Sequence, residues 1–313
     1  MPPRPPLLSF LSPKSHLSRP SDSQHSPFPP PPRASTRPSS SSRWLNRQQR
    51  DPYARQAQLN LLQSRAAYKL LDIDARHRLF VPGAHVVDLG YAPGSWSRVA
   101  ASRVRAAGAN GRAGRAGGGA PNTTRRGSVL GVDVVPARPP PGVSTIQGDF
   151  LSPHIQAEVR RFVREGAGVD SGLGAGGGHE HHPTTDAHGR VVDVVLSDMC
   201  APWPLVDAAW VRSVSNPWRR MMNTSGTGFR DHAGSMDLCA AALRFAADTL
   251  VPGGHFLCKF YQGGEDRELE RRLRLLFERV HRVKPDASRK ESREAYFVGL
   301  KRRAEVETEE VFA

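Results

Sequence analysis

The sequence predicts an α/β fold, in which strands and helices alternate along the chain and the strands form a mostly parallel sheet. Short apolar segments typical of strands are separated by segments in which apolar residues recur with helical spacing. A glycine-containing turn follows the first apolar strand and leads directly into a helix. Because parallel strands need a crossover connection, this order indicates helices on both faces of the sheet.

Ordered sequence is expected from about Arg43, and residues 64–74 have the pattern of an amphipathic helix. The apolar positions of this segment can share one side that faces a core: Ala67, Leu70, Leu71 and Ile73. Arg65 and Lys69 are four residues apart and therefore lie on the same face of that helix.

Apolar segments bounded by turn residues predict five strands, at residues 85–89, 129–132, 191–196, 254–260 and 295–300. Helical spacing predicts three further helices, starting near Trp96 and covering residues 238–250 and 266–280. Two glycine-rich insertions, residues 106–127 and 166–189, are expected to be flexible surface loops. The second insertion contains four histidines, but its glycines argue against a metal site, and we expect no metal.

Residues 1–42 are rich in proline, serine and arginine, with 12 prolines among the first 38 positions, and cannot form a packed core. Among the first 50 residues, eight are lysine or arginine and only Asp22 is acidic. This composition fits an organelle transit peptide, although the prolines weaken any amphipathic helix and a plain disordered leader stays open. Residues 304–313 are expected to be a C-terminal tail.

The formal net charge is +14, and half of this excess lies beyond the first 50 residues. A basic surface favours a polyanionic partner such as RNA, although a generally basic soluble protein would have the same balance. The three cysteines have neither CxxC spacing nor an even count, so neither a disulfide framework nor a cysteine zinc site is indicated. No apolar run approaches the roughly 18 residues of a spanning helix, and no membrane span is expected.

Residues 88–96 (DLGYAPGSW) connect a predicted strand to a predicted helix. Glycines in this position let the backbone approach a nucleoside-type cofactor, although a tight turn without a ligand has the same composition. The turn is not the dinucleotide fingerprint, because GxGxxG is absent and Pro93 interrupts it.

Acidic residues stand at the ends of three successive predicted strands: Asp133, Asp149 and Asp198. Ligands of open parallel sheets lie beyond the carboxyl ends of the strands. Asp133 could therefore accept hydrogen bonds from ribose hydroxyls, and Asp149 from an adenine amino group. Each aspartate alone is more often a turn residue, and only the repeated placement favours a ligand site.

Five motifs together resemble the FtsJ/RrmJ family of RNA ribose methyltransferases: residues 64–70 (SRAAYKL), 88–96 (DLGYAPGSW), 197–199 (SDM), 253–259 (GGHFLCK) and 292–296 (SREAY). Their order and spacing also match, and the resemblance spans residues 43–303. The lead-in at residues 43–53 (RWLNRQQRDPY) resembles the mitochondrial branch of the family, which modifies large-subunit ribosomal RNA.

The resemblance implies a Rossmann-like S-adenosylmethionine-dependent methyltransferase fold, with a seven-stranded, mostly parallel sheet whose final strand is antiparallel. It also implies a catalytic tetrad at Lys69, Asp198, Lys259 and Glu294. The family places S-adenosyl-L-methionine against residues that here are Pro93, Gly94, Ser95, Trp96, Asp133, Asp149, Phe150 and Asp198.

Methyl transfer to a ribose hydroxyl needs in-line positioning and removal of a proton from a poor nucleophile. A lysine accepts a proton only when neutral, so its pKa must be lowered by burial or by neighbouring cations. Lys259 ends an apolar strand near a second lysine and is the expected proton acceptor. Lys69 and Glu294 are then expected to position the ribose.

Three features depart from the family pattern. Tyr91 replaces a small residue and Ser95 replaces a glycine, but neither change removes a backbone donor. An insertion at residues 203–222 carries three tryptophans and three arginines, which could stack on unpaired RNA bases or equally cover apolar surface.

Basic residues lead up to Glu294, and with Arg65 they are expected to contact RNA phosphates: Arg282, Lys284, Arg289, Lys290 and Arg293. The expected activity is 2′-O-methylation of ribosomal RNA in the mitochondrial matrix, most directly at a uridine of large-subunit RNA, free or within an assembly intermediate. A monomer is favoured. The alternatives are an assembly factor whose methylation is dispensable, and a methyltransferase of transfer RNA or of messenger RNA caps.

Overall fold

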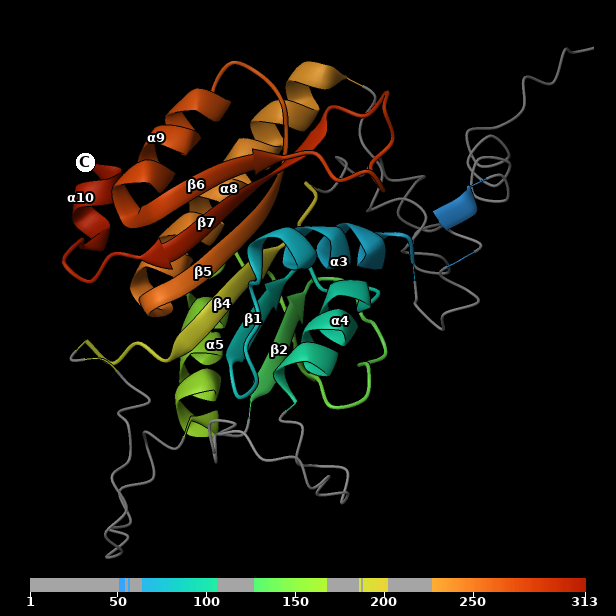
Figure 1. Ribbon diagram of the computed structural model, residues 1–313. Coiled ribbons are helices and arrows are strands. Elements are labelled where there is room, and N and C mark those ends of the chain that lie inside the picture. Colours follow the sequence, from blue (N-terminus) through green and yellow to red (C-terminus); the bar gives the residue numbers. More distant parts are fainter. Residues whose placement is uncertain are drawn as a thin grey trace, which may run out of the picture. The chain divides into compact units, whose positions relative to one another are not determined.

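The computed structural model describes residues 51–53, 56, 64–105, 127–167, 186, 188–201 and 227–313 (Figure 1). The leader at residues 1–42 and the insertion at residues 203–222 lie outside this part of the chain. So do most of the two glycine-rich insertions, of which only their ends and a few residues near 188 are described.

A seven-stranded sheet forms the centre of the described chain, with the order β3-β2-β1-β4-β5-β7-β6. The strands are β1 (His85–Leu89), β2 (Ser128–Asp133), β3 (Ser144–Gln147), β4 (Val192–Ser197), β5 (Leu250–Tyr261), β6 (Phe277–Val283) and β7 (Glu294–Arg302). The neighbours from β3 to β5 pair in parallel, and β7 pairs antiparallel with both β5 and β6. This confirms the predicted mostly parallel sheet and its antiparallel final strand.

Helices cover both faces of this sheet (Figure 1). One apolar cluster joins the sheet to α3 (Ala66–His77) and α4 (Ser95–Val104), with Leu70, Trp96 and Val194 among its members. The other cluster joins the opposite face to α5 (Pro153–Gly166), α8 (Gly228–Thr249), α9 (Asp266–Leu276) and α10 (Thr308–Phe312). Burying the central strands on both faces explains why their sequences are continuously apolar.

The predicted helix at residues 266–280 is wrong at its end, because α9 stops at Leu276 and residues 277–283 form the edge strand β6. Apolar residues continue beyond Leu276 with helical spacing, at Phe277 and Val280, so periodicity did not mark the boundary. Pairing with β7 decides the outcome, because it supplies a backbone ladder that another helical turn would lack.

The bounds of β3 were not predicted, and neither were the helices α5 and α10. The short strand β3 is exposed or half-buried throughout, and α5 contributes only Val159 and Val163 to the buried core. The predicted C-terminal tail contains α10, whose Val311 is fully buried. None of the helices in the described ranges has the length and apolar character needed to cross a lipid bilayer.

Tyr91 fits into the turn after β1 because residue 131 is a glycine. The Tyr91 hydroxyl donates a hydrogen bond to the carbonyl oxygen of Ala137 at 2.8 Å, and the ring covers Gly131 on β2. A Cβ atom added at Gly131 would lie 2.6 Å from the Cγ atom of Tyr91. The aromatic residue at position 91 therefore depends on the absence of a side chain at position 131.

We expect Gly131→Ala to destabilise the protein by about 1–3 kcal/mol, because the added methyl group overpacks the tyrosine ring. Adding Tyr91→Ala should relieve this clash, so the double variant should lose less stability than the two single losses combined. Denaturant unfolding measures all three. The control Gly166→Ala, at an open position, should be neutral or stabilising by up to about 1 kcal/mol, and simple additivity would contradict the packing argument.

Candidate active site

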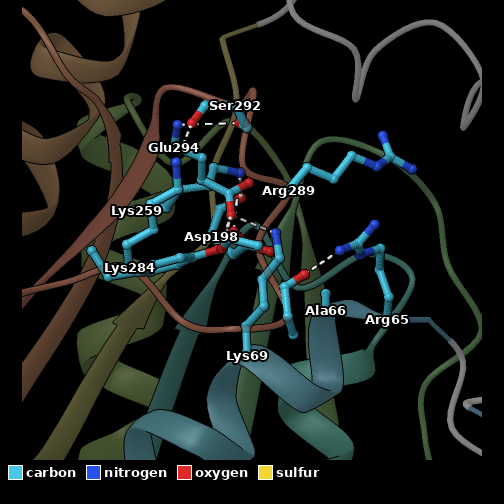
Figure 2. Close-up of polar contacts among 12 residues, drawn as sticks. Arg65, Ala66, Lys69, Asp198, Lys259, Lys284, Arg289, Ser292 and Glu294 are labelled. Carbon is cyan, nitrogen blue, oxygen red and sulfur yellow. Dashed lines mark hydrogen bonds and ion pairs between the residues drawn. The ribbon is translucent and has the colours of Figure 1, made fainter. Parts of the chain in front are cut away.

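The four predicted catalytic residues come from different parts of the chain and meet where the parallel strands of the sheet end (Figure 2). We call this side of the sheet, at the carboxyl ends of its parallel strands, the sheet edge of the active site. Lys69 lies on α3 and Asp198 directly follows β4, whereas Lys259 lies near the end of β5 and Glu294 begins β7. Antiparallel pairing sets Glu294 opposite Tyr261, two residues beyond Lys259. The start of β7 therefore reaches the same edge as the ends of β4 and β5.

These four side chains form two ion pairs. The Lys69 Nζ atom donates a hydrogen bond to the Glu294 Oε1 atom at 2.5 Å. The Lys259 Nζ atom lies 3.0 Å from the Asp198 Oδ1 atom, and it donates a hydrogen bond to the Asp198 backbone oxygen at 2.7 Å. The contact with Oδ1 is thus an ion pair, while the carbonyl oxygen receives the aligned hydrogen bond.

Charge coupling extends across both pairs. Burial alone would raise the pKa of Glu294, but the charges of Lys69 and Lys259, with hydrogen bonds from Lys69 and Tyr296, lower that pKa to about 2. Burial alone would lower the pKa of Lys259, but nearby acidic groups, Asp198 above all, hold that pKa above its ordinary value. The expected lowering of the Lys259 pKa is therefore wrong for this state, because the charges of Asp198, Cys200, Tyr261 and Glu294 outweigh burial.

Glu294 is held by further donors that the sequence did not single out. The Ser288 hydroxyl donates to the Glu294 Oε1 atom at 3.0 Å, and the Tyr296 hydroxyl donates to the same atom at 2.9 Å. Tyr296 is fully buried, and its ring lies against that of Trp96. Tyr296 lies in the motif at residues 292–296 and was the available signal for this support, whereas Ser288 lies outside that motif.

A second set of contacts ties the start of the described chain to the same region. The buried carboxylate of Asp51 forms ion pairs with Arg65 and, at 3.4 Å, with Arg289. Arg65 also donates to the backbone oxygen of Ala287, next to Ser288. This set, which we call the Asp51 brace, links the beginning of α3, which carries Lys69, to the loop before Glu294.

The turn after β1 has the geometry that close approach of a ligand to backbone requires. Gly90 and Gly94 both have positive φ angles, +78° and +105°, which favour glycine. A Cβ atom at Gly90 would lie 2.8 Å from the Cα atom of Met199. Gly94 is the N-cap of α4 and has no side-chain cap, so the first amides of α4 point to this edge of the sheet.

Asp88 lies beneath this turn and is fully buried. Its Oδ2 atom accepts a hydrogen bond from the Ser97 hydroxyl at 2.6 Å, whereas Oδ1 has no partner in the described structure. Burial raises the pKa of Asp88 to about 7, and the charges of Asp198 and Asp133 act in the same direction. This carboxyl group is therefore about half protonated at neutral pH.

The predicted cofactor residues fall into two groups. Asp133 ends β2, and its two oxygens accept hydrogen bonds from the Ala92 and Val135 amides at 2.9 and 2.8 Å. Asp149 follows β3, is exposed, and caps the Leu151 amide at 3.0 Å. Each carboxylate oxygen keeps a second lone pair, so both acids fit a polar ligand that reaches the ends of β2 and β3.

The side chains of Trp96 and Phe150 lie in the core. The Trp96 Nε1 atom donates to the Ala66 backbone oxygen at 2.9 Å, and Phe150 packs edge-on against Phe245. Ser95 shares a hydrogen bond of 2.7 Å with Ser64, which ties α4 to the start of α3. These residues can offer a ligand their backbone, but their side chains hold the turn in place.

Four of the basic residues expected to contact RNA are occupied within the protein, and two of these, Arg65 and Arg289, are held by Asp51. Arg282 pairs with Asp266 at 2.9 Å, and the Lys284 Nζ atom donates to the backbone oxygens of Ser292 and Lys290 at 2.8 and 3.1 Å. Lys284 therefore shapes the loop before Glu294, whereas Arg282 ties β6 to the start of α9. Among the described residues, no group of three or more histidines, cysteines or acids could hold a metal ion.

The sheet order, the antiparallel β7, the glycine turn and the acids at the strand ends define the class as a Rossmann-like methyltransferase. A family model described as FtsJ-like methyltransferase matches residues 62–302, and the chain belongs to that family.

Curated relatives include the mitochondrial rRNA methyltransferase 2 of Saccharomyces cerevisiae, 36% identical over 88% of this chain and 91% of that protein. The ribosomal RNA large subunit methyltransferase E of Parvibaculum lavamentivorans is 38% identical over 87% of this chain and 86% of its own length. Among solved structures, a chain described as a ribosomal RNA methyltransferase from Plasmodium falciparum is 20% identical and superimposes with a TM-score of 0.51. It covers 77% of this chain and 99% of that one, which supports the fold.

We expect Asp88→Asn to stabilise the protein increasingly as pH rises from about 4 to about 7, because the pKa of Asp88 rises from 3.8 to about 7 on folding. The folded state thus binds the proton more tightly, so ionisation destabilises it. The gain in Tm should reach several degrees, since 1 kcal/mol corresponds to about 2–4 °C at this size. The exposed control Asp237→Asn should change Tm little, and a pH-independent difference for Asp88→Asn would refute the assignment.

Proposed function

We propose that this protein methylates the ribose 2′-hydroxyl of ribosomal RNA with S-adenosyl-L-methionine as the methyl donor. The observation that carries the proposal is the convergence of Lys69, Asp198, Lys259 and Glu294 at one sheet edge. Membership of the FtsJ-like methyltransferase family supports methyl transfer. The ribose as acceptor comes from the chemistry of the tetrad, which can orient and deprotonate a hydroxyl group.

The residues that would hold the methyl donor lie along the same edge. Asp133 and Asp149 would accept hydrogen bonds from its nucleoside, and the amides near Gly94 and Ser95 would face its polar groups. When bound, the donor supplies a methyl group on a positively charged sulfur. Asp198 is the acid of the tetrad that follows β4, so its carboxylate would stabilise that positive charge.

Lys259 is the proposed proton acceptor. Its Nζ atom is charged in the structure and paired with Asp198, so only a small fraction is neutral near pH 7. A second positive charge beside Asp198 would weaken the hold of this carboxylate on Lys259 and lower the lysine pKa toward the working range. The proton of the ribose hydroxyl would then pass to the Lys259 Nζ atom.

Lys69 and Glu294 are proposed to orient the ribose. Their side chains are mostly buried, and the strongly lowered pKa of Glu294 keeps its carboxylate ionised throughout the working pH range. An ionised carboxylate accepts hydrogen bonds from ribose hydroxyls, and the Lys69 ammonium donates them. Holding the hydroxyl in line is a large part of catalysis for a displacement of this kind.

The proposed substrate is the large-subunit ribosomal RNA of mitochondria, with a uridine as the target and the matrix as the compartment. Relatives named mitochondrial rRNA methyltransferase 2 occur in Saccharomyces cerevisiae and Schizosaccharomyces pombe, and bacterial relatives are named for the large ribosomal subunit. The first 50 residues, which contain the proposed leader at residues 1–42, are basic and hold a single acid, and this composition supports import.

We expect Lys259→Arg to reduce the methylation rate about 100-fold or more, because arginine keeps the ion pair with Asp198 but cannot accept a proton. At subsaturating S-adenosyl-L-methionine, the rate of the unchanged enzyme should still be rising at about pH 9, since the raised pKa of Lys259 in the free enzyme leaves little neutral amine at lower pH. Single-turnover assays on a ribosomal RNA fragment, read out as resistance of the modified linkage to alkaline cleavage, measure both.

The control for this experiment is Lys301→Arg, an exposed lysine on β7, which should leave the rate unchanged. Equal rates for Lys259→Arg and the unchanged enzyme would remove Lys259 from the chemistry. Methylation of a base rather than a ribose would overturn the proposed acceptor. Full rescue of ribosome assembly by Lys259→Arg in a deletion strain would favour the assembly role over catalysis.

We expect residues 1–50 to direct a fluorescent protein to the mitochondrial matrix. Replacing the arginines among these residues by glutamine should abolish import, because an acid-poor, arginine-rich leader is drawn in by its positive charge. Microscopy with a matrix marker measures this. A cytosolic signal from the unchanged leader would contradict the proposed compartment without affecting the proposed chemistry.

A further inference from the structure

An open hollow of about 340 Å³ lies along β6, the free edge of the sheet. It is lined mainly by charged and ring-bearing side chains from the end of α9, from β6 and from the residue after β7: Arg274, Phe277, Glu278, Arg279, His281 and Arg303. In the backbone pairing of β6 with β7, Arg279 lies opposite Leu300, which is six residues beyond Glu294 at the start of β7. At about 3.3 Å per residue, the hollow is about 20 Å from the catalytic carboxylate.

The positive charge of this hollow is only partly balanced. Glu278 lies 3.8 Å from Lys301, and Arg274 pairs with Glu270 at 2.6 Å. Within the described part of the chain, Arg279 and Arg303 form no ion pair. Charged side chains, lysine above all, protect an edge strand from pairing with another sheet. Arg279 and Arg303, which no acid among the described residues neutralises, are in addition suited to bind an oppositely charged partner.

The positive charge at the hollow contributes to lowering the pKa of two neighbouring histidines. Burial lowers the pKa of His77, and the charges of His281, Arg76 and Arg279 lower it further against the opposing effect of Asp72. Burial likewise lowers the pKa of His255 on β5. There, Arg279 and Lys301 add to the effect, against Asp193 and a backbone hydrogen bond at Gly254. The field of Arg279 therefore reaches both neighbouring elements.

The basic surface is connected to the active site through α3. The rings of His77 and His281 lie 4.8 Å apart, which joins the end of α3 to the middle of β6. Lys69 lies two turns earlier on the same helix. A strand of nucleic acid held at Lys69 would need to extend only about 20 Å further to reach Arg279, which a few nucleotides achieve.

We propose that this hollow, with Arg279 and Arg303 as its main contacts, binds the phosphate backbone of the substrate RNA away from the methylated ribose. This inference rests on the proposed function, because it takes RNA as the substrate. Charged contacts with phosphates carry no sequence information but contribute affinity and fix the register of the RNA. The hollow should therefore affect binding of long RNA and leave the chemical step unchanged.

The test compares two double variants. The test variant carries Arg279→Gln and Arg303→Gln, and the matched control carries Arg161→Gln and Arg271→Gln. The control arginines are exposed and held in ion pairs on α5 and α9. For a long ribosomal RNA fragment, the test variant should raise the Kd about tenfold and reduce the slope of log K against log salt by about 1.4, for two contacts with single-stranded RNA. The control should change neither quantity.

A short oligonucleotide that covers only the target ribose gives the discriminating measurement. The test variant should methylate it with unchanged kcat and KM, whereas KM alone should rise for the long fragment. Arg279→Lys with Arg303→Lys, which keeps both charges, should restore most of the affinity. Unchanged binding of long RNA with an unchanged salt slope would overturn the proposal and favour an acidic protein as the partner.

The two proposals fail separately. If the unchanged enzyme methylated neither RNA, the proposed function would fail, while the comparison of Kd values and salt slopes would still decide on the hollow. Equal Tm and equal affinity for S-adenosyl-L-methionine in both double variants exclude an effect through folding. A loss of kcat on the short oligonucleotide would also overturn the proposal, because it would assign these arginines to the catalytic step.

Discussion

Compensation of four buried or half-buried charges at one sheet edge is the constraint on which the site depends. Lys69 with Glu294 and Lys259 with Asp198 each join a cation to an acid from a distant part of the chain. Removing one member of a buried pair leaves the other charge unpaired, which is far more costly than losing an exposed pair. The two ion pairs that connect α3 with β7 and β5 with the end of β4 therefore also set the protonation state of the site.

The order of the strands makes this arrangement possible. Because β7 enters the sheet antiparallel between β5 and β6, its first residue rather than its last reaches the carboxyl ends of the parallel strands. A parallel strand in that position would carry Glu294 to the opposite edge. The antiparallel direction of one strand thus brings the fourth member of the tetrad to the other three.

The sequence predicted much of the fold from local signals, and the family resemblance pointed to the four residues that the structure brings together. His85–Leu89 is a fully buried strand with an apolar centre and a glycine turn after it, and its predicted bounds are those of β1. The end of α9 was missed because Val280 continues a helical spacing that only pairing with β7 overrides. The charge state of Lys259 was also missed, since Asp198 and Glu294 approach it from other strands.

Contacts between distant segments explain the remaining differences. The core positions of Trp96 and Phe150 follow from Ala66 and Phe245, which are far from them in sequence. Asp51 lies in the lead-in segment at residues 43–53, whose sequence gives no indication of a partner for it. Its side chain is nevertheless among the least exposed of the acids. Tyr91 was recognised as unusual, but its dependence on Gly131 needed the register of β1 against β2.

The Asp51 brace has a consequence for how the protein matures. Its carboxylate lies only a few residues beyond the proposed leader, yet it is bound to Arg65 and Arg289 beside the catalytic loop. A processing peptidase that cut a short distance too far downstream would leave both guanidinium groups without their shared acid. If the proposed leader is removed, the folded enzyme limits how far downstream the cut can fall, because Asp51 is the first carboxylate that the remaining chain must keep.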